Sequence, residues 1–440
     1  MKKVTLPNIL SGLVLAIFFF LPFERIPTFD VGGFTVKISY LLAIAFLSCW
    51  LFGLLFRKDK FVKFRGSEVI LVGLFISDLI SFMLAPTKRG LIFTLLWLFM
   101  FLIYFSFSRV IAKISFEKIE KFLIAAAIFI SIFGLVQFLG DTFDAPTTFT
   151  GLLQRYTKEV FGFARIQSVA LEPLYFANFL IIPILISLRK YIFGAKFFNS
   201  TFWLIVLFLV NFLLTMSRGA FLGMGVALLI FLIYIICNKT IANRFAKIGG
   251  GIVAFILSLG ICFGLIWLNQ MVRDIKNPPK DGQKVQLTSS FLQQTTNVVP
   301  SQRSDYSTFE RLGFYGSAID SFKKKPIFGA GPASFGYLYT PAAQLANGQY
   351  LIVNNEYLEL LAENGAVGLT LFLLFLVFLA IEIRKATRSL PLAQKSTVIA
   401  LSLGMLAVLI QYNFFSTLYV ISFWVFLAWL NSYQFKQNEK

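Results

Sequence analysis

Three arginines that are far apart in the sequence could do chemistry together, and two of them stand beside hydrophobic segments, where a charge is expensive. Arg165 shortly precedes one apolar run, Arg218 lies between two runs with almost no loop, and Arg311 lies in a long polar stretch. Asn354 stands later in the same stretch. Arginine keeps its charge and carries five hydrogen-bond donors. If the chain brings these residues to one face, they form a pocket for a ligand.

Each of these residues also has a structural alternative. Arg165 can extend its side chain to lipid headgroups, and Arg218 can anchor a hairpin. Arg311 can pair with Glu310 or with lipid. Glu172, which precedes a proline, is also typical of a helix start, because acidic residues and proline favour that end. Residue type alone therefore leaves structural and ligand-binding roles open.

The chain contains no histidine and only three cysteines, Cys49, Cys237 and Cys262. This excludes a histidine base, a histidine metal ligand and a histidine pH switch. The cysteines lie in or beside apolar runs and form no CxxC pair, which favours packing residues over a metal site or a disulfide framework. We expect no metal site and no cofactor.

The elements that must position the arginines are membrane helices. Hydrophobic residues make up 58% of the chain and charged residues 14%, against about 45–50% and about 25% in soluble domains. A bilayer-crossing helix needs about 20 apolar residues. The sequence therefore predicts an all-α polytopic membrane protein. Its twelve predicted spans lie near residues 6–23, 38–56, 68–85, 90–107, 121–139, 174–188, 201–217, 219–237, 249–268, 366–383, 396–413 and 416–432.

The distribution of basic residues predicts the orientation of these spans. With the N-terminus in the cytoplasm, 23 of the 40 Lys and Arg residues fall in predicted inner segments, 8 in short outer segments and 9 in the long loop. The net charge of +19 then comes mostly from basic residues on the cytoplasmic side of the spans, and no nucleic acid is needed to explain it. We expect both termini to be cytoplasmic. The first span is retained, because Pro22-Phe23-Glu24 offers no small-residue cleavage site.

One polar stretch interrupts the spans and divides the chain into three parts. Residues 1–268 form a bundle of about nine spans with an outer loop at 140–173. Residues 269–365 form an extracytoplasmic loop, far longer than the 2–8 residues that usually join helices. Residues 366–440 add about three spans. The long loop is therefore the first place to look for function.

Two short helices are predicted within this loop. Apolar residues recur at three- and four-residue steps in the first, typical of an amphipathic helix: Phe309, Leu312, Gly316, Ile319 and Phe322. The second spans Asn354 to Glu363, and Gly365 and Gly368 end it and begin the tenth span.

Several motifs around the loop occur together in one known family. They are Arg165-x-x-Ser168-x-x-x-Glu172-Pro173-x-x-x-Ala177, Ser217-Arg218-Gly219, Arg311, Pro326-Ile327-Phe328-Gly329-x-Gly331-x-x-x-Phe335, Asn354-Asn355-x-Tyr357-Leu358 and Glu363-x-Gly365-x-x-Gly368. In their order and spacing the chain resembles the O-antigen ligase and O-antigen polymerase superfamily of bacterial envelope enzymes.

The resemblance implies a glycosyltransferase-C-like fold in the bacterial inner membrane, with membrane lipids around it. Such enzymes take glycan from undecaprenyl pyrophosphate on the outer leaflet and pass it to lipid A core, to another lipid-linked repeat or to protein. The resemblance also implies functional roles for Arg218, Arg311 and Arg165. Arginine binds phosphate oxygens bidentately, so it stabilises the charge that grows on the diphosphate without a metal.

One position departs from the family pattern. Many relatives have histidine where this chain has Asn354, which can form hydrogen bonds but cannot accept a proton at working pH. Either the departing diphosphate takes the proton of the acceptor hydroxyl or a carboxylate does. The candidates are Glu172, Glu356 and Glu310, in that order. The departure favours polymerase-type transfer over ligation to lipid A core.

The predicted functional residues fall into two groups. We assign catalytic roles to Arg218, Arg311, Glu172 and Asn354, and substrate binding to Arg165, Ser217, Glu310, Asn355, Glu356 and Tyr357. The alternative functions are O-antigen ligation and transport of the same lipid-linked glycan. Transport is disfavoured, because a transporter places its charges near the midplane of the membrane, whereas these lie at the predicted outer face.

Overall fold

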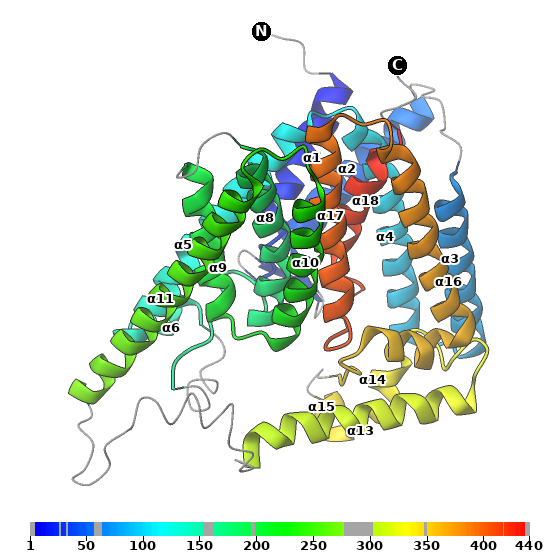
Figure 1. Ribbon diagram of the computed structural model, residues 1–440. Helices are drawn as coiled ribbons and strands as arrows, with labels where there is room; N and C mark the ends of the chain where they lie inside the picture. The colour runs from blue at the N-terminus through cyan, green and yellow to red at the C-terminus, as the bar shows by residue number, and fades with distance from the viewer. Residues whose placement is uncertain are drawn as a thin grey trace.

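The computed structural model describes residues 5–25, 28–31, 34–56, 64–152, 162–194, 199–276, 302–346, 350–416 and 418–435. Most of these residues are helical (Figure 1). The apolar helices are α1 (Leu6–Phe20), α2 (Ile38–Phe56), α3 (Gly66–Leu84), α4 (Lys88–Ala112), α5 (Phe116–Thr142), α8 (Pro173–Phe193), α9 (Ser200–Leu214), α10 (Arg218–Cys237), α11 (Arg244–Lys276), α16 (Glu356–Thr387), α17 (Leu392–Gln411) and α18 (Ile421–Ser432). The other helices are α6 (Thr147–Thr150), α13 (Gln302–Lys324), α14 (Ser334–Tyr339) and α15 (Ala342–Ala346).

The apolar helices make the chain a multi-pass membrane protein. Among the described residues, nine helices are long and apolar enough to cross a bilayer, and α1, α9 and α18 are shorter apolar helices. In the apolar stretch of α8, 78% of the residues are buried by the rest of the protein, against 17% in α11. The α8 helix is therefore central, whereas α11 presents most of its surface to the surroundings, as expected of a lipid-facing helix.

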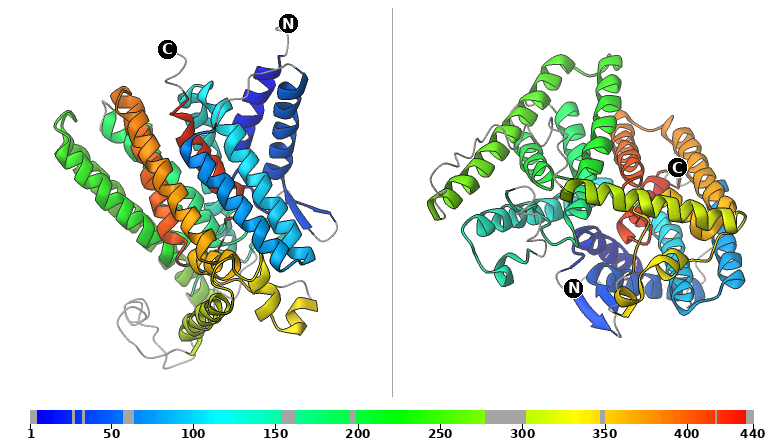
Figure 2. Two further views of the ribbon diagram at one scale, coloured as in Figure 1. Left: turned by 90° about the vertical axis from the view of Figure 1, so that its right-hand side faces the viewer. Right: turned by 90° about the horizontal axis from the view of Figure 1, so that it is seen from below.

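The loop helices gather at one end of the bundle. Helix α13 runs across this end, below the ends of the upright helices, while α1 begins and α18 ends at the opposite end (Figure 1). Seen from below, α13 passes under the bundle (Figure 2). A small apolar cluster of Ala318, Phe335, Val353 and Ala362 lies between α13, the α14 segment and α16. We call this end of the bundle the α13 end.

One element departs from the all-α prediction. A two-stranded antiparallel hairpin, β1 (Thr28–Val31) and β2 (Phe34–Lys37), joins α1 to α2, with Thr28 opposite Lys37. The strands are only four residues each, too short for an alternating pattern to stand out between two apolar runs.

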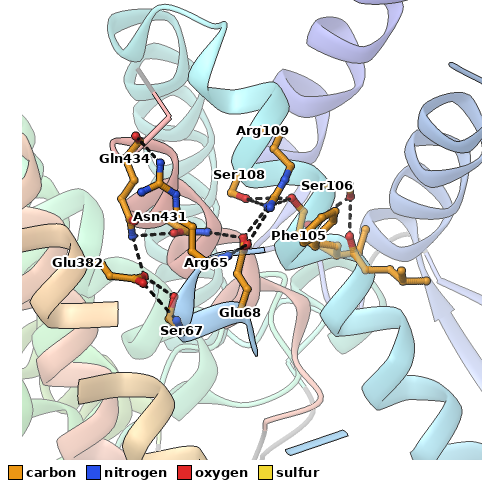
Figure 3. A network of polar contacts seen from close by, with 12 residues as sticks. Arg65, Ser67, Glu68, Phe105, Ser106, Ser108, Arg109, Glu382, Asn431 and Gln434 are labelled. Atoms are coloured by element: carbon orange, nitrogen blue, oxygen red, sulfur yellow. Dashed lines mark hydrogen bonds and ion pairs between the residues drawn. The ribbon is translucent and has the colours of Figure 1, made fainter. Parts of the chain in front are cut away.

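Polar side chains fix the end of the bundle opposite α13 (Figure 3). The fully buried Glu68 of α3 accepts two hydrogen bonds from Arg109 of α4, at 2.5 and 2.7 Å. Asn431 of α18 donates to the same carboxylate at 3.1 Å. Glu382 of α16 accepts from Ser67 at 2.5 Å. Buried charges need such partners, and here the partners join α3, α4, α16 and α18.

Candidate functional site

The turn between α17 and α18 connects the segments that carry the predicted site residues. It comprises residues 412–416 and 418, and we call it the α17–α18 turn. Gln411, the last residue of α17, donates to the Leu174 carbonyl of α8 at 3.4 Å. Phe415 packs edge-on against Tyr175, with ring centroids 5.8 Å apart. The N-terminal end of α8, which follows Glu172, is thereby held beside this turn.

Arg218 reaches the same turn through the start of α10. Ser217 is its buried N-cap residue, and Arg218, the first residue of the helix, is exposed. A Cβ atom at Gly219 would lie 2.9 Å from the Phe414 ring, so glycine is needed for this close approach. The start of α10, where Arg218 is exposed, therefore lies next to the α17–α18 turn.

Arg165 is tied to the end of α9, shortly before the start of α10. Its Nε donates to the Thr215 carbonyl at 2.8 Å, and the amide of Ile166 donates to the Leu214 carbonyl at 3.4 Å. Met216, which follows, has a φ of 48°, in the left-handed region that a non-glycine residue rarely adopts. This tight connection sets Arg165 and Arg218 on either side of one short turn.

Arg311 and Asn354 approach the turn from the long loop. Tyr315 lies one helical turn after Arg311, so the two share a face of α13. The Tyr315 hydroxyl donates to the Asn413 carbonyl at 3.1 Å and lies 3.4 Å from the carbonyl of Asn354. Arg311 is half-buried, and Asn354 adopts a φ of 58°. Both residues are thus brought to the α17–α18 turn.

The residues after Asn354 secure this arrangement. Asn355 caps α16, its side chain accepting from the Leu358 amide at 3.1 Å, and it also donates to the Asn413 carbonyl at 3.4 Å. Glu356 is 3% exposed, and its carboxylate accepts from the Leu418 amide at 3.0 Å. The hydroxyl of Tyr357 donates to the Leu409 carbonyl at 2.7 Å.

Three residues that we predicted to bind substrate are therefore engaged with α16 itself or with the end of α17 and its turn. The Glu356 carboxylate is enclosed by protein, a position suited to holding the turn. Glu310 lies on α13, but its side chain falls outside those that the structure describes.

Glu172 precedes α8 and is the N-cap residue of this helix, without a side-chain capping hydrogen bond. Its side chain is exposed, yet the protein around the carboxyl removes enough water to raise its pKa above the usual value. The charge of Arg165 opposes this rise in the pKa, and the charge of Glu24 adds to it. Arg165 and Glu172 are therefore close enough to interact, and a carboxyl with a raised pKa is a better proton acceptor.

The glycine-rich motif of the loop forms a clamp against α16. Gly365 breaks that helix with a φ of 68°, and any side chain at this position would collide with the Ile327 carbonyl. The carboxylate of Glu363 accepts from the amides of Ala333 and Phe335, at 2.8 and 3.1 Å. This carboxylate thus caps α14, and the predicted helix break at Gly365 is confirmed.

The described part of the long loop holds more helix than the two short helices that we predicted. Besides α13 and the segment of α16 before Gly365, it contains α14 and α15, of six and five residues. Helices this short show no apolar periodicity. The carboxylate that caps α14 belongs to Glu363, which follows Ala333 by 30 residues and Phe335 by 28. The sequence near α14 therefore gives little sign of this cap.

Sequence reasoning missed three residues of this site. Tyr315 and Asn413 join α13 to the α17–α18 turn, and the polar break at Asn413 between two apolar runs is the signal that marks the turn. Glu24 follows α1, is 6% exposed and accepts from the amide of Leu171 at 3.2 Å. A lone glutamate after an apolar run gives no sign of this contact.

The comparisons with known proteins agree with the sequence motifs. A family model described as O-antigen ligase matches residues 203–373. The matched region contains Arg218, Arg311 and Asn354, whereas Arg165 and Glu172 precede it. No curated protein matches the chain. The family predicted from the sequence is confirmed by this match.

Proposed function

Residues 203–373 belong to the O-antigen ligase family, and from this premise we propose that the protein is a membrane glycosyltransferase of the polymerase type. It moves glycan from undecaprenyl pyrophosphate to an acceptor hydroxyl at the outer face of the bacterial inner membrane. The observation that carries the proposal is the convergence of three segments on the α17–α18 turn: the start of α10, where Gly219 lies close to Phe414, the face of α13 that Arg311 shares with Tyr315, and Asn354. Arg165 is bound to the Thr215 carbonyl, three residues before Arg218.

In the proposed reaction, the oxygen of the acceptor hydroxyl attacks the anomeric carbon of the donor glycan. A new carbon–oxygen bond forms as the bond to the diphosphate breaks, and the diphosphate leaves with the electron pair. Arg218 and Arg311 hold the diphosphate oxygens, where negative charge grows. Because guanidinium groups supply the positive charge, the transfer needs no metal.

The proton of the acceptor hydroxyl passes to Glu172 in this scheme. Its raised pKa and its position beside Arg165 support this role. Glu356 is less suited, because its buried carboxylate is already bound to the Leu418 amide. Asn354 orients the acceptor hydroxyl by hydrogen bonding, and Ser217 and Glu310 keep the substrate-binding roles predicted from the sequence.

The proposed topology has twelve crossings, with α1, α9 and α18 added to the nine longer helices. The bundle then comprises residues 1–268 and 366–440, and residues 269–365 form the extracytoplasmic loop. Both termini are cytoplasmic. The position of α13 at the end opposite the start of α1 supports this assignment (Figure 1).

Two observations bear on the choice between polymerase and ligase. Asn354 in place of histidine, and the Arg165 to Glu172 segment beside Arg218, favour polymerisation, with a lipid-linked glycan as acceptor. The description of the matched family favours the second candidate, ligation to lipid A core. Transport is less well supported, since these arginines lie at one end of the bundle.

Deletion of the gene in the bacterium that encodes the protein is the experiment that tests this function. If the protein polymerises, single repeats should accumulate on the lipid carrier, and long surface glycan should be lost. If it ligates, long polymer should accumulate on the carrier instead. Electrophoresis of surface glycan and mass analysis of the extracted carrier distinguish the two. An unchanged glycan profile would contradict both functions.

A further inference from the structure

We propose that Glu24 is a positioning residue for the transfer reaction. Together with Glu172 it forms a carboxylate pair in which Glu24 holds the segment that carries Glu172 and supplies a second negative charge beside it. This inference rests on the proposed function, in which Glu172 accepts the proton of the acceptor hydroxyl.

The first line of support is the contact between the end of α1 and the loop before α8. The backbone amides of Glu24 and Arg25 both donate to the Val169 carbonyl, at 3.2 and 3.1 Å. In return, the Glu24 carboxylate accepts from the amide of Leu171 at 3.2 Å. These three hydrogen bonds fix the residues directly before Glu172. Glu24 thereby fixes the backbone that directly precedes Glu172.

The second line of support is the charge around the pair. The ammonium of Lys37, on β2, lies 3.6 Å from the Glu24 carboxylate, and Arg165 acts on Glu172 from the loop side. Tyr175, in the first turn of α8, lies within electrostatic reach of both carboxylates and of Glu356. Two carboxylates are therefore flanked by two cations, one facing each member of the pair.

Two further titratable groups of the described part of the chain lie near Glu24, and both are bound elsewhere. Tyr40 of α2 lies within electrostatic reach of Glu24 and donates its hydroxyl hydrogen to the Tyr419 carbonyl at 2.6 Å. The guanidinium of Arg25 donates to the Gly151 carbonyl.

The third line of support is a cavity beneath the site. Glu24, Ala170, Tyr175 and Tyr412 line it together, with apolar side chains of α8, α17 and α18 as the other walls. Glu24 therefore faces the interior between the start of α8 and the α17–α18 turn. Because Glu24 is 6% exposed, little water screens its charge from the neighbouring groups.

The consequence for the reaction is a more basic Glu172. A like charge nearby disfavours the ionised form and raises the pKa of a carboxyl group. Burial of the carboxyl is the main cause of the raised pKa of Glu172, the charge of Arg165 opposes it, and the charge of Glu24 adds a further rise. A proton acceptor is most effective when its pKa lies near the working pH, so Glu24 makes Glu172 better suited to the role that a histidine base would have.

The test is the pH dependence of glycan transfer by purified protein in proteoliposomes. The probe is lipid-linked glycan extracted from a strain that lacks this protein. In Glu24→Gln the side-chain oxygen still accepts from Leu171, but the charge is lost, so the acid limb of the rate should move to lower pH by about half a unit. In Lys37→Gln the cation that faces Glu24 is removed, so the negative charge of Glu24 raises the pKa of Glu172 further. The acid limb should then move to higher pH by a similar amount.

Opposite shifts from these two substitutions are the result that supports the inference, because a loss of structure alone does not move the limb in both directions. If Glu24→Gln fails to fold, the shift in Lys37→Gln decides. Unchanged acid limbs in folded variants, with Glu172→Gln still inactive, would overturn the role of Glu24 and leave the proposed function standing. A fully active Glu172→Gln would instead overturn the proposed proton acceptor.

Discussion

Replacing Arg218 or Arg311 by alanine should lower the rate of glycan transfer by about 10²–10³-fold while the protein remains folded and inserted. Each substitution removes a fixed positive charge from the site where the diphosphate becomes more negative. Lysine at either position should restore only part of the rate, because an ammonium keeps the charge but loses bidentate binding. The measurement is the initial rate of transfer with extracted lipid-linked glycan.

A matched control comes from the other end of the same bundle. Arg384 is exposed in the last turns of α16, far from the α17–α18 turn. Arg384→Ala removes the same type of side chain, and the transfer rate should be unchanged. Normal rates in Arg218→Ala and Arg311→Ala, with stable insertion, would remove both residues from the catalytic site.

Replacing Glu172 by glutamine should lower the transfer rate by about 10²-fold or more and abolish the acid limb of the pH profile. The pKa of Glu172 is raised in the protein, so in the unmodified chain the rate should fall as the pH drops through that raised pKa. Glutamine cannot accept the proton, and the residual rate should no longer depend on pH in this range.

Glu356→Gln provides the comparison for this substitution. Its carboxylate is buried and accepts from the Leu418 amide, which a glutamine oxygen can also do. We expect this variant to keep the acid limb of the pH profile and to remain folded in detergent, because the hydrogen bond to the Leu418 amide is kept. A lost acid limb in Glu356→Gln, with a normal limb in Glu172→Gln, would make Glu356 the proton acceptor in place of Glu172.

Apolar runs and glycines predicted much of this fold. Each predicted span overlaps an apolar helix, and nine of these helices, in the described part of the chain, are long and apolar enough to cross a bilayer. A segment of about 20 apolar residues is stable in a membrane as a helix. Gly365 also marked its helix break correctly, since its φ of 68° suits glycine. The four-residue strands between α1 and α2 did not stand out, because so few residues carry no period.

The predicted topology placed the arginines at one face of the bundle, but it did not predict the contacts that hold their segments together. Tyr315 donates to the Asn413 backbone carbonyl, and Gly219 lies close to the Phe414 ring. A backbone carbonyl is present in every residue, so residue type does not single out Asn413 as the acceptor. Sequence therefore gives no sign of such contacts. Glu356 was expected to bind substrate because of its neighbours, whereas its burial depends on a turn some 60 residues later.

The release of undecaprenyl diphosphate by purified protein, in the presence of EDTA, measures arginine-led transfer most directly. The assay uses proteoliposomes and lipid-linked glycan extracted from a strain that lacks this protein. We expect one diphosphate to be released for each glycosidic bond formed, with full activity in EDTA and almost none in the Arg218→Ala, Arg311→Ala double variant. A strict requirement for a divalent cation, or undiminished release by the double variant, would contradict arginine-led transfer.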